Sequence, residues 1–126
     1  MRQDLREALR DHDRAVKLAP DVGSVFINRS NSLVRANRFE PAMRDLERAI
    51  ELADESLAYA HYNRALLFQR LGDSQAARAD AEKAAEIAPE SAGYRAFLEE
   101  LHEVAPAATV APAATVAPAE QPSLPQ

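Results

Sequence analysis

Apolar residues recur every three to four positions along most of the chain, which is the period of an amphipathic helix rather than of a strand. One such run includes Tyr62, Ala65 and Phe68 and is interrupted at Gly72. A second run, rich in alanine, follows and stops at Pro89. Glycine readily takes the left-handed conformation that ends a helix, and proline cannot continue one. We therefore expect two consecutive helices here.

Similar residues mark the ends of other helices. Asn37 stands where a second left-handed residue is needed, and asparagine is the most suitable residue after glycine. Asp73 or Ser74 can cap the helix that follows, by accepting a hydrogen bond from its first free N–H groups. Pro20 ends the opening helix, and Pro41 falls in the first turn of another, where a missing N–H costs little.

These helix pairs repeat along the chain. When residues 23–56 are laid on residues 58–91, about 35 positions further on, many residue types coincide. The coincident pairs include Asn28/Asn63, Arg29/Arg64, Arg35/Arg70, Ala42/Ala77, Asp45/Asp80, Ala49/Ala84 and Ser56/Ser91. Residues 1–22 match the second half of the same unit. A recurrence near this length in a helical sequence indicates a helical repeat protein.

The units resemble the tetratricopeptide repeat, a helix–turn–helix motif with small residues where helices cross and a proline near its end. The matching positions are Ala65, Phe68, Gly72, Asp73, Ala77, Ala84 and Pro89 in one unit, Phe26, Leu33, Ala42, Leu46 and Ala49 in the other, and Ala8, Ala15 and Pro20 in the opening helix. The departures from the pattern are His61, Arg29, Arg64, Ser30, Asp54 and the additional Leu57.

The resemblance implies an all-α fold, a right-handed α-solenoid of antiparallel helix pairs with about two and a half units. We expect a partial unit, its second helix only, at 1–22, complete units at 23–57 and 58–91, and a capping helix at 92–103. Residues 104–126 contain VAPAAT twice and regularly spaced prolines. We expect them to form a disordered Pro/Ala-rich tail, acting as a spacer or a weak docking segment.

In this family the first helices of the units line a concave groove that holds a peptide or a protein segment. Carried over by position, the binding residues of the groove here are Ile27, Asn28, Asn31, Arg35, Tyr59, Tyr62, Asn63, Leu66 and Arg70, and Ser24, Val34 and Gln69 lie on the same side. Asparagine amides can bond a peptide backbone, and arginine can grip a carboxylate. Two alternatives stay open: Tyr59 and Tyr62 can simply pack between helices, and Asn28 and Asn63 can hold their own scaffold.

Some family members clamp a terminal carboxylate with cationic and asparagine side chains from several first helices. Asn31 and Asn63 match the asparagine positions, but Ile27, Gly93 and Phe97 stand at the cationic ones. We therefore do not expect a clamp for a chaperone tail.

Two charged residue types also recur. Arg29 and Arg64 repeat beside Asp11, Asp45 and Asp80, and we expect ion pairs between neighbouring helices. Such pairs point to scaffold rather than to ligand binding.

Composition and the absence of catalytic motifs argue against several classes of function. The net charge of −5 disfavours nucleic acid and anionic membrane surfaces as partners. The chain has no cysteine, no phosphate loop and no nucleophile motif, and Glu99 with His102 is half a metal site at most. We expect no enzyme activity, no metal and no cofactor. The charged beginning lacks the apolar segment of a signal peptide, and no apolar run is long enough to span a membrane; we expect a cytoplasmic protein.

The expected function is a peptide-binding adaptor or scaffold. The alternative is self-association through residues 2–19, because the half unit leaves part of an apolar stripe without a partner helix. That stripe consists of Leu5, Ala8, Leu9, Ala15, Val16 and Ala19. An N-terminally shortened chain explains the half unit equally well. A third hypothesis is a regulatory part of a larger assembly, tethered by the tail.

Overall fold

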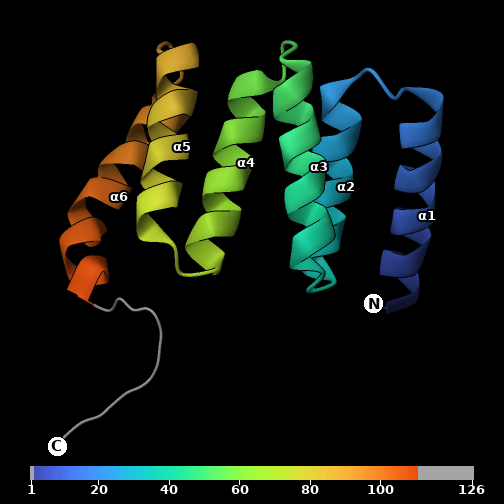
Figure 1. The fold of residues 1–126 in the computed structure, drawn as a ribbon, viewed down its shortest axis with the longest axis horizontal. Coiled ribbons are helices and arrows are strands. Elements are labelled where there is room, and N and C mark those ends of the chain that lie inside the picture. Colours follow the sequence, from blue (N-terminus) through green and yellow to red (C-terminus); the bar gives the residue numbers. More distant parts are fainter. Residues whose placement is uncertain (1, 111–126) are drawn as a thin grey trace, which may run out of the picture.

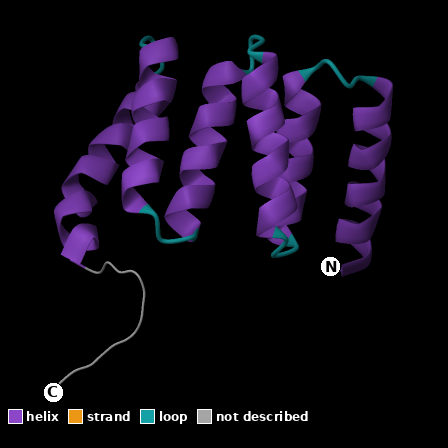
Figure 2. Ribbon diagram, viewed as in Figure 1, coloured by secondary structure: helices purple, strands orange, loops and turns teal. Residues whose placement is uncertain are grey.

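The computed structural model describes residues 2–110, with side chains from residue 3 to residue 102. Over this range the chain forms six helices and no strand. They are α1 (Arg2–Leu18), α2 (Gly23–Arg35), α3 (Phe39–Leu52), α4 (Leu57–Arg70), α5 (Ser74–Ile87) and α6 (Ala92–Val110). The helices stand side by side in a row from α1 to α6 (Figure 1), and short loops reverse the chain between them (Figure 2). The predicted all-α solenoid is confirmed.

Helices adjacent in sequence pack against each other along the whole row. In addition, α2 contacts α4, although α3 lies between them in the chain. The first helices of two consecutive pairs therefore share one side of the solenoid, which is the side expected to carry the groove. None of the helices in residues 2–110 is long and apolar enough to cross a membrane.

Two of the turns form where the sequence predicts them. Asn37 and Gly72 have positive φ angles of 61° and 87°, as expected for residues that end a helix in the left-handed conformation. The side chain of Asp73 accepts a hydrogen bond of 3.1 Å from the N–H of Ala76 and so caps α5. Ala53 ends α3 in the left-handed conformation with φ 50°. The sequence did not predict this turn, because the residue is neither glycine nor asparagine.

The core depends on small residues at the helix crossings. Ala42, Ala49, Ala65, Ala77 and Ala84 are each at most 1% exposed. Short side chains at the contact allow two helix axes to approach closely. The recurrence of alanine in the sequence thus corresponds to close packing between consecutive helices.

Larger side chains fill the space around these crossings. The main cluster includes Phe26, Ile27, Leu33, Leu46 and Leu67, and it joins α2, α3 and α4. A smaller cluster joins α4, α5 and α6 through Ala65, Ala81 and Leu101, with Phe97 and Leu98 packed against it. One side of the last helix therefore covers the end of the core.

The last helix is longer than predicted. The sequence places its end at residue 103, but α6 continues to Val110 and includes Pro106. Pro106 lacks an N–H and cannot donate a helix hydrogen bond, but its neighbours Ala105, Ala107 and Ala108 are strong helix formers that extend a helix already nucleated. The predicted start of the tail at residue 104 is therefore wrong for 104–110. The rest of the predicted tail, 111–126, lies outside the described residues.

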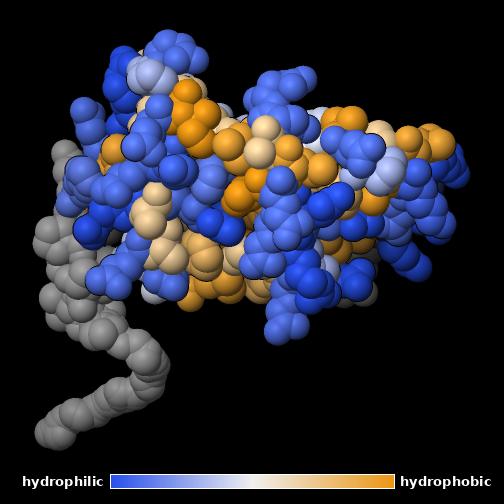
Figure 3. All heavy atoms as spheres, turned by 45° about the horizontal axis from the view of Figure 1, so that its top comes forward, coloured by the Kyte–Doolittle hydropathy of each residue, from blue (hydrophilic) through white to orange (hydrophobic). Residues whose placement is uncertain are grey.

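The first helix is covered on one side. Leu9 and Val16 of α1 pack against the main cluster. The predicted stripe of Leu5, Ala8, Leu9, Ala15, Val16 and Ala19 is half-buried throughout. Beyond it, Leu18 is 79% exposed and Val22 is 43% exposed. Figure 3 shows that hydrophobic patches interrupt an otherwise hydrophilic surface on the face seen there.

Candidate functional site

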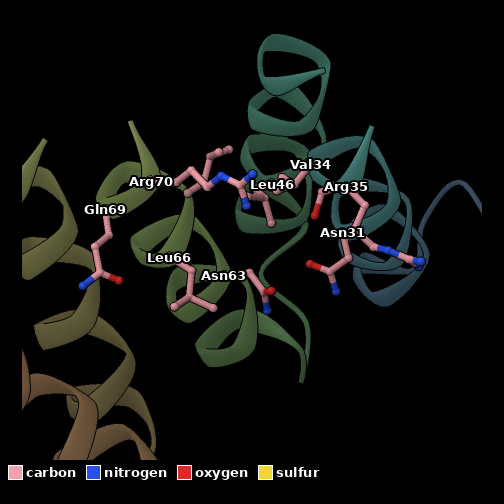
Figure 4. Close-up of a pocket in the computed structure, with 10 residues that line it drawn as sticks. Asn31, Val34, Arg35, Leu46, Asn63, Leu66, Gln69 and Arg70 are labelled. Atoms are coloured by element: carbon pink, nitrogen blue, oxygen red, sulfur yellow. The ribbon is translucent and has the colours of Figure 1, made fainter. Parts of the chain in front are cut away.

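A cleft of about 490 Å³ opens on the side of the solenoid that α2 and α4 share. Its lining comes from these two helices, with one residue from α3: Ser30, Asn31, Val34, Arg35, Leu46, Asn63, Leu66, Leu67, Gln69 and Arg70. The cleft has an apolar base, and amide and guanidinium groups lie around it. In the close-up of Figure 4 the amides of Asn31 and Asn63 face the space between α2 and α4.

Five of the nine predicted groove residues line this cleft. They are Asn31, Arg35, Asn63, Leu66 and Arg70. Leu66 is 37% exposed and offers apolar surface to a ligand. The guanidinium carbon of Arg70 lies 5.6 Å from the centre of the Phe39 ring, a cation–π contact that holds this side chain beside the cleft. The structure thus gathers residues from two repeats, and peptide binding by them stays a prediction.

The repeated asparagines Asn28 and Asn63 have different surroundings. The Asn63 side chain is buried and donates a hydrogen bond of 2.9 Å to the carbonyl oxygen of Tyr59, one turn earlier in α4. Asn28 is exposed and does not line the cleft. Asn63 therefore supports its own helix while its other groups remain beside the cleft.

The predicted groove tyrosines form an aromatic cluster instead of lining the cleft. Tyr62 lies between the rings of Tyr59, Tyr94 and Phe97, with centroid distances of 6.3, 5.3 and 5.1 Å. Burial raises the pKa of the Tyr94 hydroxyl above its ordinary value, and the nearby Tyr59 and Tyr62 hydroxyls add to this rise. Packing, the simpler alternative for Tyr62, thus accounts for its position, because the cluster fastens α6 to α4. Tyr59 remains 42% exposed.

The structure removes Ile27, a predicted groove residue, from the surface. Its side chain is completely buried and belongs to the same cluster as Ala60 of α4. Since alanine is short, α4 closes over α2 at this level, and the cleft opens only from Ser30 onward. The assignment of Ile27 to the groove surface is therefore wrong.

Sequence reasoning also missed lining residues. Ser30, Leu46 and Leu67 contribute to the cleft but were not expected there. The Ser30 hydroxyl donates a hydrogen bond of 2.7 Å to the Ile27 carbonyl oxygen, so it is already used within α2. Leu46 belongs to a second helix, and periodicity within one helix cannot show that it reaches a cleft between two others.

Repeated ion pairs hold the helices that carry the cleft. Arg29 binds both carboxylate oxygens of Asp45 at 2.8 Å, and Arg64 binds both oxygens of Asp80 at 2.7 and 3.0 Å. These two predicted inter-helix pairs are confirmed. A third partner differs from the prediction, because Arg29 contacts Asp13 rather than Asp11. The hydrogen bond to Asp45 is the main cause that raises the pKa of Arg29.

The second repeat adds a histidine to this arrangement. His61 takes the register position of Phe26 and is buried, with its Nδ1 atom 2.8 Å from the Asp80 carboxylate. Asp80 thus joins two side chains of α4 to α5. Within residues 3–102, no three His, Cys, Asp or Glu side chains gather as a metal site requires.

Part of this chain is similar in sequence to known repeat proteins. Residues 58–91 match the family model described as tetratricopeptide repeat. A relative from Arabidopsis thaliana, described as a TPR repeat-containing thioredoxin, TTL4, is 38% identical over 72 residues, which is 57% of this chain and 10% of that protein. The chain therefore spans about a tenth of the length of this relative.

Solved structures show the same fold. The first TPR of Spaghetti (RPAP3), bound to the HSP90 peptide SRMEEVD, superposes with a TM-score of 0.71 at 20% sequence identity. The match covers 83% of this chain and 82% of that one. Residues 58–91 thus match a tetratricopeptide repeat, and the helices of this chain have the same fold as the tetratricopeptide-repeat structure on which they superpose.

Proposed function

We propose that this protein is an interaction module that binds an extended segment of a partner protein in the cleft between α2 and α4. The first TPR of Spaghetti, with the same fold, is described in complex with a peptide. The proposal transfers the kind of ligand, a peptide, and not its sequence. Binding, rather than catalysis, is the proposed role.

The chemistry of the cleft supports this proposal. Leu66 and Val34 provide apolar surface for a side chain, whereas Asn31 and Asn63 offer amide groups that can donate to and accept from a peptide backbone. Arg35 and Arg70 stand at the end of the cleft where α2 and α4 finish. Apolar surface with a few placed polar groups is typical of a binding site.

The placement of two asparagines is the main support for this function. Asn31 and Asn63 come from consecutive first helices and face one space (Figure 4). The ion-paired residues Arg29, Asp45, Arg64 and Asp80 do not line this cleft. An amide on each side of an open cleft suits an extended chain, whose N–H and C=O groups alternate on both edges.

The proposal can be tested with a peptide selected on the purified protein from a random displayed library. Its affinity is then measured by isothermal titration calorimetry for the wild type and for an Asn31→Ala/Leu66→Ala variant. We expect the variant to bind at least about tenfold more weakly, since it loses an amide and an apolar contact at the centre of the site. Circular dichroism should show unchanged helix content.

A matched control separates the cleft from the remaining surface. Gln75→Ala/Ile87→Ala also removes an amide and an apolar side chain, both from α5; Ile87 is 38% exposed, much as Leu66 is 37% exposed. This control should bind the peptide with wild-type affinity. Equal losses in both variants, or failure of the library to yield any binder, would refute the proposed cleft.

Self-association through residues 2–19 is the second candidate. The observation in its favour is the exposure of Leu18 and Val22 beside the half-buried stripe of α1. Analytical ultracentrifugation across a wide concentration range decides it. A dimer that Leu18→Ser disrupts would support this candidate, and a monomer at every concentration would exclude it.

A further inference from the structure

A second cleft, of about 550 Å³, lies between the beginning of α1 and the turn that joins α2 to α3. Its lining consists of Leu5, Arg6, Leu9, Arg35, Ala36, Asn37 and Arg38. Three arginines from different elements therefore surround one space, and two leucines form its apolar wall. No acidic residue belongs to this lining.

Among the side chains of residues 3–102, these arginines form no ion pair. Within the described side chains, Arg29, Arg48 and Arg64 form ion pairs with carboxylates, whereas Arg6, Arg35 and Arg38 form none. The acidic residues in the first turns of α1 and α3, Asp4 and Glu40, are exposed and lie outside the lining. None of the ion pairs among residues 3–102 thus involves the three arginines of this cleft, in a protein whose net charge is −5.

The fold by itself gives little reason for this arrangement. Arg35 lies in the last turn of α2, where a cation is favourable. Arg38, in contrast, immediately precedes the first turn of α3, a position that favours an anion. Like charges around one cleft repel one another, and a bound anion would remove that repulsion.

We propose that this second cleft binds an acidic peptide segment, with carboxylates of the segment on Arg6 and Arg38 and an apolar side chain against Leu5 and Leu9. Guanidinium groups bind carboxylates through two parallel hydrogen bonds. The apolar wall favours a peptide over a small inorganic anion, because the anion has no apolar group that could contact Leu5 and Leu9. This segment is a ligand in its own right, and the proposal does not depend on occupancy of the α2–α4 cleft.

The position of the second cleft is compatible with a long ligand. Arg35 lines both this cleft and the α2–α4 cleft, and in Figure 4 its guanidinium extends away from α4. Arg38 and Leu9 also line a third space of about 390 Å³, together with Arg44 and with Arg29 and its ion-pair partners Asp13 and Asp45. Arg35 therefore joins the second cleft to the α2–α4 cleft, whereas the third space already contains carboxylates.

The test uses a fluorescent peptide of alternating glutamate and leucine residues, blocked at both ends, and a counterpart with glutamine in place of glutamate. Fluorescence anisotropy measures their binding to the full chain at low salt. We expect the acidic peptide to bind at least about tenfold more tightly than the neutral one. Raising the salt concentration should weaken its binding, because the contacts are charge pairs near the surface.

Variants then locate the site. Arg6→Gln/Arg38→Gln should weaken binding of the acidic peptide about tenfold or more and leave the melting temperature unchanged or higher, since repulsion decreases. The control Arg48→Gln/Arg95→Gln removes the same charge from exposed positions elsewhere, and it should bind like the wild type. Arg35 is kept because it also lines the α2–α4 cleft.

Three results would overturn the proposal. The first is equal binding of the acidic and neutral peptides. The second is equal loss in both double variants, which would mean that net charge alone attracts the peptide. The third is tighter binding of a single-stranded oligonucleotide than of the acidic peptide, which would assign the arginines to phosphate groups.

Discussion

The carboxylate of Asp54 accepts a hydrogen bond of 2.7 Å from the backbone N–H of Gly23. The contact joins the loop between α3 and α4 to the first residue of α2, across a separation of 31 positions in the chain. The same carboxylate also accepts hydrogen bonds from the N–H and the hydroxyl of Ser56, at 2.9 and 2.6 Å. Asp54, which departs from the proline of the family pattern, thus fixes the entry of the first complete repeat.

We predict that Gly23→Ala destabilises the protein by about 1–3 kcal/mol, as overpacking usually does. An added Cβ would collide with the Ser56 hydroxyl and lie 2.8 Å from the Asp54 carboxylate. Urea denaturation followed by circular dichroism measures the change. Gly93→Ala is the control: its Cβ meets nothing closer than 3.8 Å, and it should be neutral or stabilising by up to about 1 kcal/mol. A neutral Gly23→Ala would mean that the loop moves away freely.

Acid should weaken the same junction. The hydrogen bond from the Ser56 hydroxyl, followed by those from the N–H groups of Gly23 and Ser56, lowers the pKa of Asp54 below 3.8. A lowered folded-state pKa contributes stability above the unfolded value, and this contribution is lost as the pH falls through the folded one. We predict that Asp54→Asn loses less melting temperature than the wild type between about pH 6 and about pH 3. The exposed neighbour Glu55, changed to Gln, should leave the wild-type loss intact.

Asp80→Ala should cost about 3 kcal/mol of stability, in the range found when one partner of a buried ion pair is removed. The Asp80 side chain is 6% exposed, and its loss leaves Arg64 and His61 without their common partner. Chemical denaturation measures the effect. Glu51→Ala, which breaks an exposed pair with Arg48, should cost less than about 1 kcal/mol. If both variants lost the same free energy of unfolding, the buried ion pairs of Asp80 would contribute no more to stability than an exposed pair does.

The alanines at the helix crossings should not tolerate larger side chains. Ala77→Leu places a branched side chain at a fully buried contact of α5, and we expect a loss of about 1–3 kcal/mol. Ala79, two positions further on the same helix, is exposed, so Ala79→Leu should change stability by less than about 0.5 kcal/mol. Thermal melting of the two variants gives the comparison, and a stable Ala77→Leu would contradict close packing at this crossing.

Local features were predictable because they depend on residues close together in the chain. Gly72 and Asn37 end helices since few residues accept a positive φ angle. The repeat spacing also predicted the Arg29–Asp45 and Arg64–Asp80 pairs, because the same two residue types stand 16 positions apart in both repeats. The left-handed turn at Ala53 was not predicted, since alanine rarely adopts a positive φ angle.

The candidate cleft was predictable only in part. Asn31 and Asn63 follow from register, but helical periodicity cannot say how far two helices close over each other. At Ile27 they meet, and the residue is buried; one turn later they separate, and Asn31 faces the cleft. Tyr62 likewise packs on α6 because Tyr94 and Phe97 reach it from a distant helix.

The sequence by itself therefore determined the helices, their turns, their repetition and the small residues at their crossings. All of these follow from backbone sterics and from the period of the α-helix. The tertiary structure decided which side chains of each helix face a neighbour and which face a cleft. It also brought Asp54 to Gly23 and Arg6 to the cleft of Arg38. Such contacts depend on the distance and rotation between packed helices, and no spacing along the chain encodes them.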